Sequence, residues 1–213
     1  MKMKLWAEAI GTAFLLIGVV GSGIMAETLS PDNTGVALLG NAIATGCVLY
    51  VLITILGPVS GAHFNPAVTL AFRLRGDIET KDALAYVSVQ IAGGIIGVWV
   101  THLMFDIPVL QLSQHARTGG AQWWAEIVAT FGLVAVIFGG IRHRAEAVPT
   151  LVALYITGAY FFTASTSFAN PAVTIARSLT DTFAGIVPAH APMFIAMQIF
   201  GAVLAVVGCK RMF

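Results

Sequence analysis

The chain has 213 residues, of which 58% are hydrophobic and only 10% are charged, and its formal net charge is +1. Soluble domains carry roughly 25% charged residues, so this composition excludes an ordinary soluble protein, and the near-neutral balance gives no indication of nucleic-acid binding. The two cysteines, Cys47 and Cys209, both lie in apolar runs and do not indicate a disulfide framework.

Six apolar segments are long enough to cross a bilayer, whose hydrocarbon core of about 30 Å needs roughly 20 helical residues. In chain order, we expect membrane-spanning helices near residues 4–26, 35–57, 82–105, 122–140, 148–166 and 190–209. The first follows two lysines as a signal peptide would, but it is too long for one and contains Glu8. We therefore expect it to stay in the protein.

Two shorter apolar pieces, near residues 64–73 and 169–178, both contain the string NPAVT. At 1.5 Å per residue each extends about 14 Å as a helix, which is roughly half of the bilayer core. Asparagine is a good helix N-cap, and proline suits the first helical position. Each box therefore predicts the start of a re-entrant half-helix; the boxes are Asn65, Pro66, Ala67 and Asn170, Pro171, Ala172.

The two halves of the chain resemble each other. LWAEAIGTAF from Leu5 matches WWAEIVATFG from Trp123, which aligns Glu8 with Glu126, and the NPAVT strings align likewise. Each half holds three spans and one half-helix, and an odd number of spans makes the second half enter from the opposite side. We expect one all-α channel domain over residues 1–213, built as an inverted repeat of about 1–106 and 120–213.

The basic residues agree with this layout. If both termini are cytoplasmic, only Arg117 and Arg177 fall outside, which is a strong positive-inside bias. The residues expected inside are Lys2, Lys4, Arg73, Arg75, Lys81, Arg142, Arg144, Lys210 and Arg211.

The paired boxes predict a common centre. Each asparagine caps its half-helix with its carbonyl oxygen, so its NH2 group remains as a donor. The positive ends of the two half-helices meet near mid-membrane. Such a point accepts oxygen lone pairs and repels cations, which favours the passage of small neutral solutes.

These boxes, the preceding SGAHF, the glutamates of the first and fourth spans and the glutamines of the third and sixth closely resemble the aquaporin or major intrinsic protein family. The resemblance implies six spans and two half-helices, one pore per subunit, a homotetramer and a location in the inner (plasma) membrane. It also implies a ladder of backbone carbonyls before the boxes, formed by Gly61, Ala62, His63, Thr166, Ser167 and Phe168.

The resemblance places a selectivity filter toward the outside, at Thr45, Gly158, Ser167 and Val173. Water-selective members usually have an aromatic residue, a histidine, a small residue and an arginine there. All four residues of this chain are small or medium-sized, so we expect a wide constriction. Arg177 shares a helix face with Val173. Two interpretations stay open: Arg177 supplies the missing charge from one turn farther out, or it snorkels to the surface.

Two buried carboxylates and one histidine have alternatives of their own. Glu8 and Glu126 are expected to anchor the half-helix loops, as the family implies, rather than to relay protons. His63 is expected to pack or join the carbonyl ladder, because no second metal ligand lies at a suitable spacing. The sequence shows no nucleophile–base pair, phosphate loop or metal cluster. We therefore expect no enzyme, cofactor or metal.

The sequence thus predicts a passive channel in the lipid bilayer for water and larger neutral solutes, such as glycerol, urea or arsenous acid. The alternatives are a strictly water-selective aquaporin, an active secondary transporter and a closed-pore structural protein. A transporter needs intramembrane charges for ion coupling, and apart from the two glutamates there are almost none.

Overall fold

The computed structural model describes residues 1–210, within which the chain forms helices and no strand. The helices are α1 (Lys2–Leu29), α2 (Thr34–Ser60), α3 (Pro66–Arg75), α4 (Thr80–Met104), α5 (Gly120–His143), α6 (Val148–Phe162), α7 (Pro171–Arg177) and α8 (Ala191–Cys209). Single 3₁₀ turns at Ala145–Ala147 and Pro188–His190 precede α6 and α8. Six helices are long and apolar enough to cross a membrane, which confirms the predicted all-α membrane fold. Arg211 lies outside the described residues.

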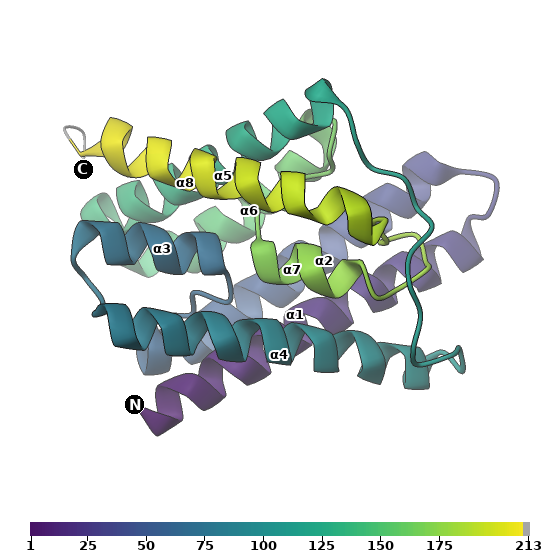
Figure 1. Ribbon diagram of the computed structural model, residues 1–213, viewed down its shortest axis with the longest axis horizontal. Coiled ribbons are helices and arrows are strands. Elements are labelled where there is room, and N and C mark those ends of the chain that lie inside the picture. The colour runs from purple at the N-terminus through teal and green to yellow at the C-terminus, as the bar shows by residue number, and fades with distance from the viewer. Residues whose placement is uncertain (211–213) are drawn as a thin grey trace.

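The two short helices lie end to end in the middle of the bundle (Figure 1). Both α3 and α7 contact α4 and α8, and they also contact each other. The N-terminus and the end of the described chain lie at the same end of the bundle, which we call the terminal end. The opposite end, which we call the loop end, carries the long connection 105–119 and the segment 178–190 (Figure 1).

Glycines bring the long helices together in the same way in the two halves. A Cβ atom on Gly93 of α4 would collide with the backbone of Ala9 in α1. A Cβ on Gly201 of α8 would likewise reach the Ile127 carbonyl of α5, at 2.6 Å. Small residues at these crossings let the backbones approach closely, as in other membrane helix pairs.

Helix α6 ends at Phe162 rather than at the expected residue 166. Residues 163–170 form an irregular loop that carries the chain back to mid-bundle, and Thr166, Ser167 and Ala169 have positive φ angles there. A helix cannot include such residues. The other spans begin and end within four residues of the expected positions.

Large apolar side chains cover the outside of the bundle. Trp6 and Trp124, which the repeat aligns, are both 65% exposed. In water such a surface is unfavourable, whereas in lipid it contacts acyl chains at no such cost. The exposed apolar surface therefore agrees with a membrane location.

Candidate functional site

Asn65 and Asn170 cap the two half-helices as the sequence predicts. The Asn65 Oδ1 accepts a hydrogen bond of 2.8 Å from the backbone N–H of Ala67. The Asn170 Oδ1 accepts one of 3.0 Å from Ala172. In both helices proline follows the asparagine at the first position, where no backbone N–H is needed.

The same two asparagines join the half-helices to each other. The Asn65 Nδ2 donates to the Ala169 carbonyl at 2.7 Å, and the Asn170 Nδ2 donates to the Phe64 carbonyl at 2.8 Å. This cross-link, which the sequence analysis did not foresee, uses one of the two N–H bonds of each amide. The second N–H of each remains, and both asparagines line the central cavity.

The loops before the boxes hold an unusual backbone conformation. Ala62 and Phe64 have φ angles of 50° and 47°, and Ser167 and Ala169 have 52° and 49° at the corresponding places. Residues with a Cβ rarely adopt this left-handed region, so each one costs of order 1–3 kcal/mol unless its surroundings enforce it. Because both loops share this conformation, we expect side chains of the neighbouring helices to hold each loop in place.

Glu8 of α1 anchors the first loop. Its Oε1 accepts hydrogen bonds from the Ser60 hydroxyl at 2.6 Å and from the His63 backbone N–H at 3.0 Å. Its Oε2 accepts from the Phe64 N–H at 2.7 Å and from the Gln90 Nε2 at 2.8 Å. One buried carboxylate therefore satisfies two backbone donors of a strained loop.

Glu126 of α5 does the same for the second loop. Its carboxylate accepts from the backbone N–H groups of Phe168 and Ala169 at 2.9 and 2.8 Å. The Gln198 Nε2 donates to it at 2.6 Å. Neither Glu126 nor Glu8 lines the cavity. This geometry is that of an anchor, and it places neither carboxylate on a proton path through the cavity.

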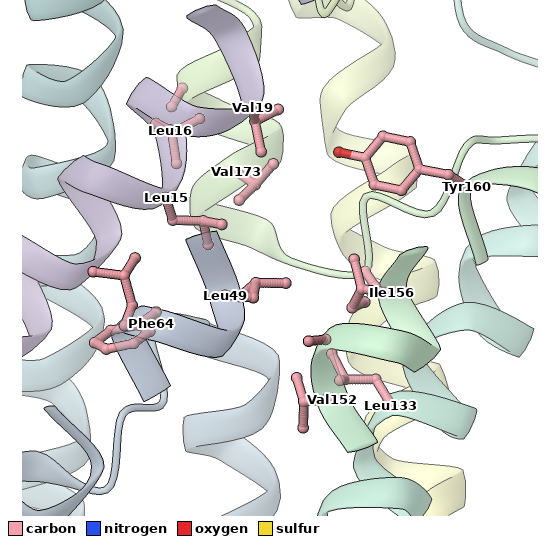
Figure 2. Packing of buried hydrophobic residues seen from close by; sticks show 14 of the residues in the cluster. Leu15, Leu16, Val19, Leu49, Phe64, Leu133, Val152, Ile156, Tyr160 and Val173 are labelled. Atoms are coloured by element: carbon pink, nitrogen blue, oxygen red, sulfur yellow. The ribbon is translucent and has the colours of Figure 1, made fainter. Parts of the chain in front are cut away.

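A cavity of about 520 Å³ runs along the bundle beside the half-helices. Its lining extends from Ile141, Glu146 and Pro149 near the terminal end to Arg177 near the loop end. Between them the walls are mostly apolar (Figure 2). Residues of α1, α2 and α7 face those of α5 and α6 there: Leu15, Val19, Leu49 and Val173 opposite Leu133, Val152, Ile156 and Tyr160.

The expected carbonyl-ladder residues lie along this cavity with one exception. Gly61, Ala62, His63, Ser167 and Phe168 are lining residues. Thr166 is half-buried and lies outside the lining.

His63 is held by packing. Its Nδ1 lies 3.1 Å from the Thr69 Oγ1, and its ring stacks on Phe72 with centroids 4.5 Å apart. Within residues 1–210 no group of three His, Cys, Asp or Glu side chains is placed to hold a metal ion.

At the loop end, the structure corrects the expected filter. Gly158 is exposed on the outside of α6 and does not line the cavity, so its assignment to the filter is wrong. Two residues farther along α6, Tyr160 lines the cavity, and its hydroxyl lies 3.1 Å from the Thr45 Oγ1. Helix α6 turns by about 100° per residue, so residues 158 and 160 lie on nearly opposite faces. The cavity lining at the loop end therefore does contain an aromatic residue.

The other expected positions do line this end. Thr45, Ser167 and Val173 all contribute to the cavity. The Ser167 Oγ is buried and has no hydrogen-bond partner among the described residues. It is a polar atom available to whatever occupies the cavity.

Arg177 does not snorkel to the surface. Its residue is only 2% exposed, and it lines the cavity together with Val173. Its Nε donates to the Ala184 carbonyl, and its guanidinium carbon lies 3.5 Å from the centroid of the Phe168 ring. The interpretation in which the Arg177 side chain reaches the membrane surface is therefore excluded.

A second arginine lies beside the first. Arg117 donates from Nε to the Gly185 carbonyl at 2.8 Å and from Nη2 to the Phe183 carbonyl at 3.2 Å. Its guanidinium carbon lies 5.3 Å from the Phe168 centroid. Three successive carbonyls, 183 to 185, thus hold two arginines. Neither arginine forms an ion pair within residues 1–210, although the charge of Glu126 acts on both from a distance.

The exposed His115 in the 105–119 connection lies within reach of the charges of these arginines. Partial burial lowers the pKa of His115, and the nearby charges of Arg117 and Arg177 lower it further. Burial also lowers the pKa of Arg117. Glu27 and Asp181 act on His115 in the opposite direction, so charges of both signs surround it.

Comparison with known proteins agrees with this architecture. A sequence model of the major intrinsic protein family matches residues 1–169. The chain is 59% identical over 199 residues to aquaglyceroporin AqpS of Rhizobium meliloti (strain 1021), covering 93% of this chain and 85% of the relative. The chain belongs to the major intrinsic protein family. As a member it is a membrane channel for water and small neutral solutes, and not an enzyme.

More distant members of the major intrinsic protein family also match. The chain is 33% identical over 177 residues to probable aquaporin PIP2-8 of Arabidopsis thaliana, covering 75% of this chain and 64% of the relative. The crystal structure of the aquaglyceroporin from Plasmodium falciparum aligns with a TM-score of 0.78 at 20% identity. That alignment covers 99% of this chain and 96% of the other, and shows a shared fold.

Sequence reasoning missed Tyr160 in this member of the major intrinsic protein family. The second box carries no information on the length of the loop between α6 and α7. The apolar pattern does not distinguish the two faces either, because Leu151 and Leu154 precede Gly158 at helical spacing as Ala153 and Ile156 precede Tyr160.

Proposed function

We propose that this chain forms a passive pore whose solutes include, besides water, uncharged molecules of glycerol size, with glycerol, urea and undissociated arsenous acid as the candidates. One observation carries the proposal: a largely apolar cavity of about 520 Å³ passes both box asparagines and is lined by polar side chains at its loop end. Apolar walls cannot replace the hydration shell of an ion, so ions are excluded. A few hydrogen-bond donors along one side are enough to bind the hydroxyl groups of a neutral compound.

The polar groups of the cavity favour an oxygen-bearing solute. The free N–H groups of Asn65 and Asn170 lie midway, and the Ser167 hydroxyl and Arg177 lie at the loop end. All four are able to donate to solute oxygens. A molecule with several hydroxyl groups can replace its hydrogen bonds to water with hydrogen bonds to these four residues, one after another, as it passes.

The proposal is tested by stopped-flow light scattering on proteoliposomes that contain the purified protein. Vesicles are challenged separately with an impermeant osmolyte, glycerol, urea and arsenous acid. We expect water flux and the uptake of at least one larger solute, well above the rates of empty vesicles. Water flux without uptake of any larger solute favours the strictly water-selective alternative. Solute accumulation against a gradient favours a transporter, and no flux at all favours a closed pore.

We also propose the assembly and orientation that the family resemblance implies: a homotetramer in the inner membrane with both termini cytoplasmic. The basic residues at the terminal end, including Lys2, Arg73 and Arg142, support this orientation. Accordingly, the loop end faces outward. Mass measurement in detergent tests the tetramer, and protease access to a C-terminal tag in intact spheroplasts tests the orientation.

A further inference from the structure

Arg177 is a buried cation without a counter-ion. It is 2% exposed at the end of α7 and, within residues 1–210, it forms no ion pair. A second cation, Arg117, approaches the same Phe168 ring, and the buried Glu126 opposes it without forming an ion pair with Arg177. An uncompensated charge at membrane depth is costly, so such residues usually mark a solute or ion path.

Two contacts fix the direction of the guanidinium. The Nε is bound by the Ala184 carbonyl, and one face of the group covers the Phe168 ring at 3.5 Å. Phe168 is itself held edge-on by Phe194, with centroids 5.2 Å apart. Stacking on an aromatic face stabilises an arginine while leaving its edge donors free.

The terminal Nη groups of Arg177 have no hydrogen-bond partner among the described residues, and the side chain lines the cavity. The buried Ser167 Oγ, also unpartnered, lines the same end. Val173, one turn earlier on α7, presents only methyl groups to the cavity. The charge of the constriction is therefore displaced by one turn, rather than lost.

We propose that Arg177, braced by Phe168 and by the Ala184 carbonyl, is the cation barrier of this pore and that its Nη groups, with the Ser167 hydroxyl, bind the oxygen atoms of passing neutral solutes. The inference rests on the proposed pore. A fixed positive charge in a narrow space of low dielectric constant raises the energy of any entering cation. A neutral solute meets no such barrier and gains hydrogen bonds.

The test compares cation leak with neutral flux in the same proteoliposomes. Arg177→Gln replaces the guanidinium with a shorter, neutral amide, which removes the charge and both Nη groups. We expect proton flux, measured with an internal pH dye under a valinomycin clamp, to rise about tenfold or more because the fixed charge is gone. Glycerol flux should also change, because the Nη groups that bind the solute are lost. Arg142→Gln, which removes an exposed arginine at the terminal end, is the matched control and should leave both fluxes unchanged.

A charge-keeping variant covers the case in which Arg177→Gln does not fold. Arg177→Lys retains the positive charge, so cations should remain excluded, while the ranking of neutral solutes changes because the planar donors are lost. The proposal is overturned if folded Arg177→Gln leaks no more cations than wild type, or if Arg177→Lys leaks them freely. Failure of the proposed pore itself would be distinguishable from these outcomes, because wild-type vesicles would then show no solute flux.

Discussion

The hydroxyl oxygens of Thr45 and Tyr160 lie 3.1 Å apart, which joins α2 to α6 at the loop end of the cavity. The Tyr160 ring is buried and its hydroxyl points into the space between the cavity walls (Figure 2). We therefore expect Tyr160 to limit the cross-section that a solute meets after passing the asparagines.

Tyr160→Ala should widen the constriction. We expect vesicles with this variant to take up larger polyols, such as erythritol or sorbitol, faster than wild type, because the ring volume is removed from the cavity. Tyr160→Phe keeps the ring and loses one hydrogen bond, so it should lower stability by only about 1 kcal/mol and preserve size selection. Phe161→Ala is the control, since Phe161 is exposed on the outside. Equal polyol uptake by all three variants would contradict this role.

Asn170→Asp should weaken the joint between the half-helices. The variant places a carboxylate oxygen against the Phe64 carbonyl, where Asn170 Nδ2 now donates at 2.8 Å. Losing a buried hydrogen bond and leaving an acceptor unsatisfied costs about 1–3 kcal/mol. Tryptophan fluorescence during chemical unfolding in detergent measures the loss. Asn33→Asp is the matched control. Asn33 caps the exposed start of α2 with its side-chain oxygen, and aspartate keeps that oxygen. A similar change in both variants would argue against the cross-link.

Glu126→Gln should disturb the second loop more than its small change in shape suggests. The carboxylate accepts two backbone N–H groups, from Phe168 and Ala169. An amide offers one oxygen and places NH2 donors against the other N–H. We expect a lower unfolding temperature and reduced solute flux, at a cost of about 1–3 kcal/mol for each unsatisfied donor. The exposed Glu79→Gln serves for comparison. Unchanged flux and stability in Glu126→Gln would show that the loop needs no anchor.

The imidazole of His115 reports the charge of the loop end. Its pKa is lowered by burial and then by Arg117 and Arg177. Removing a nearby positive charge stabilises the imidazolium, so Arg117→Gln should raise the pKa of His115 toward its ordinary value near 6.5. NMR titration of the full-length protein in detergent measures this, with the signal assigned by a His115→Gln variant. An unchanged or lower pKa would contradict the effect of Arg117 on His115.

Much of the fold was predictable because the membrane imposes simple rules. Spans follow from apolar length, and the half-helix starts follow from the chemistry of asparagine and proline. The roles of Glu8 and Glu126 followed from the repeat together with the family resemblance. These features depend on local sequence or on a match between two segments.

The constriction was harder to predict, because four separate elements form it. Tyr160 reaches the cavity through the rotation of α6, which depends on where the irregular loop after Phe162 begins. The environment of Arg177 depends on carbonyl 184 and on Phe168, neither of which has a signature in sequence. The cross-link between Asn65 and the Ala169 carbonyl likewise appears only once both loops are placed.

The most direct test of the account follows glycerol and protons together in one preparation of wild-type proteoliposomes, by light scattering and an internal pH dye. We predict rapid uptake of glycerol, or of urea or arsenous acid in its place, while the internal pH holds at the level of empty vesicles under an imposed proton gradient. Proton entry at a rate comparable to solute uptake, or uptake of all three solutes no faster than in empty vesicles, would contradict the proposed pore.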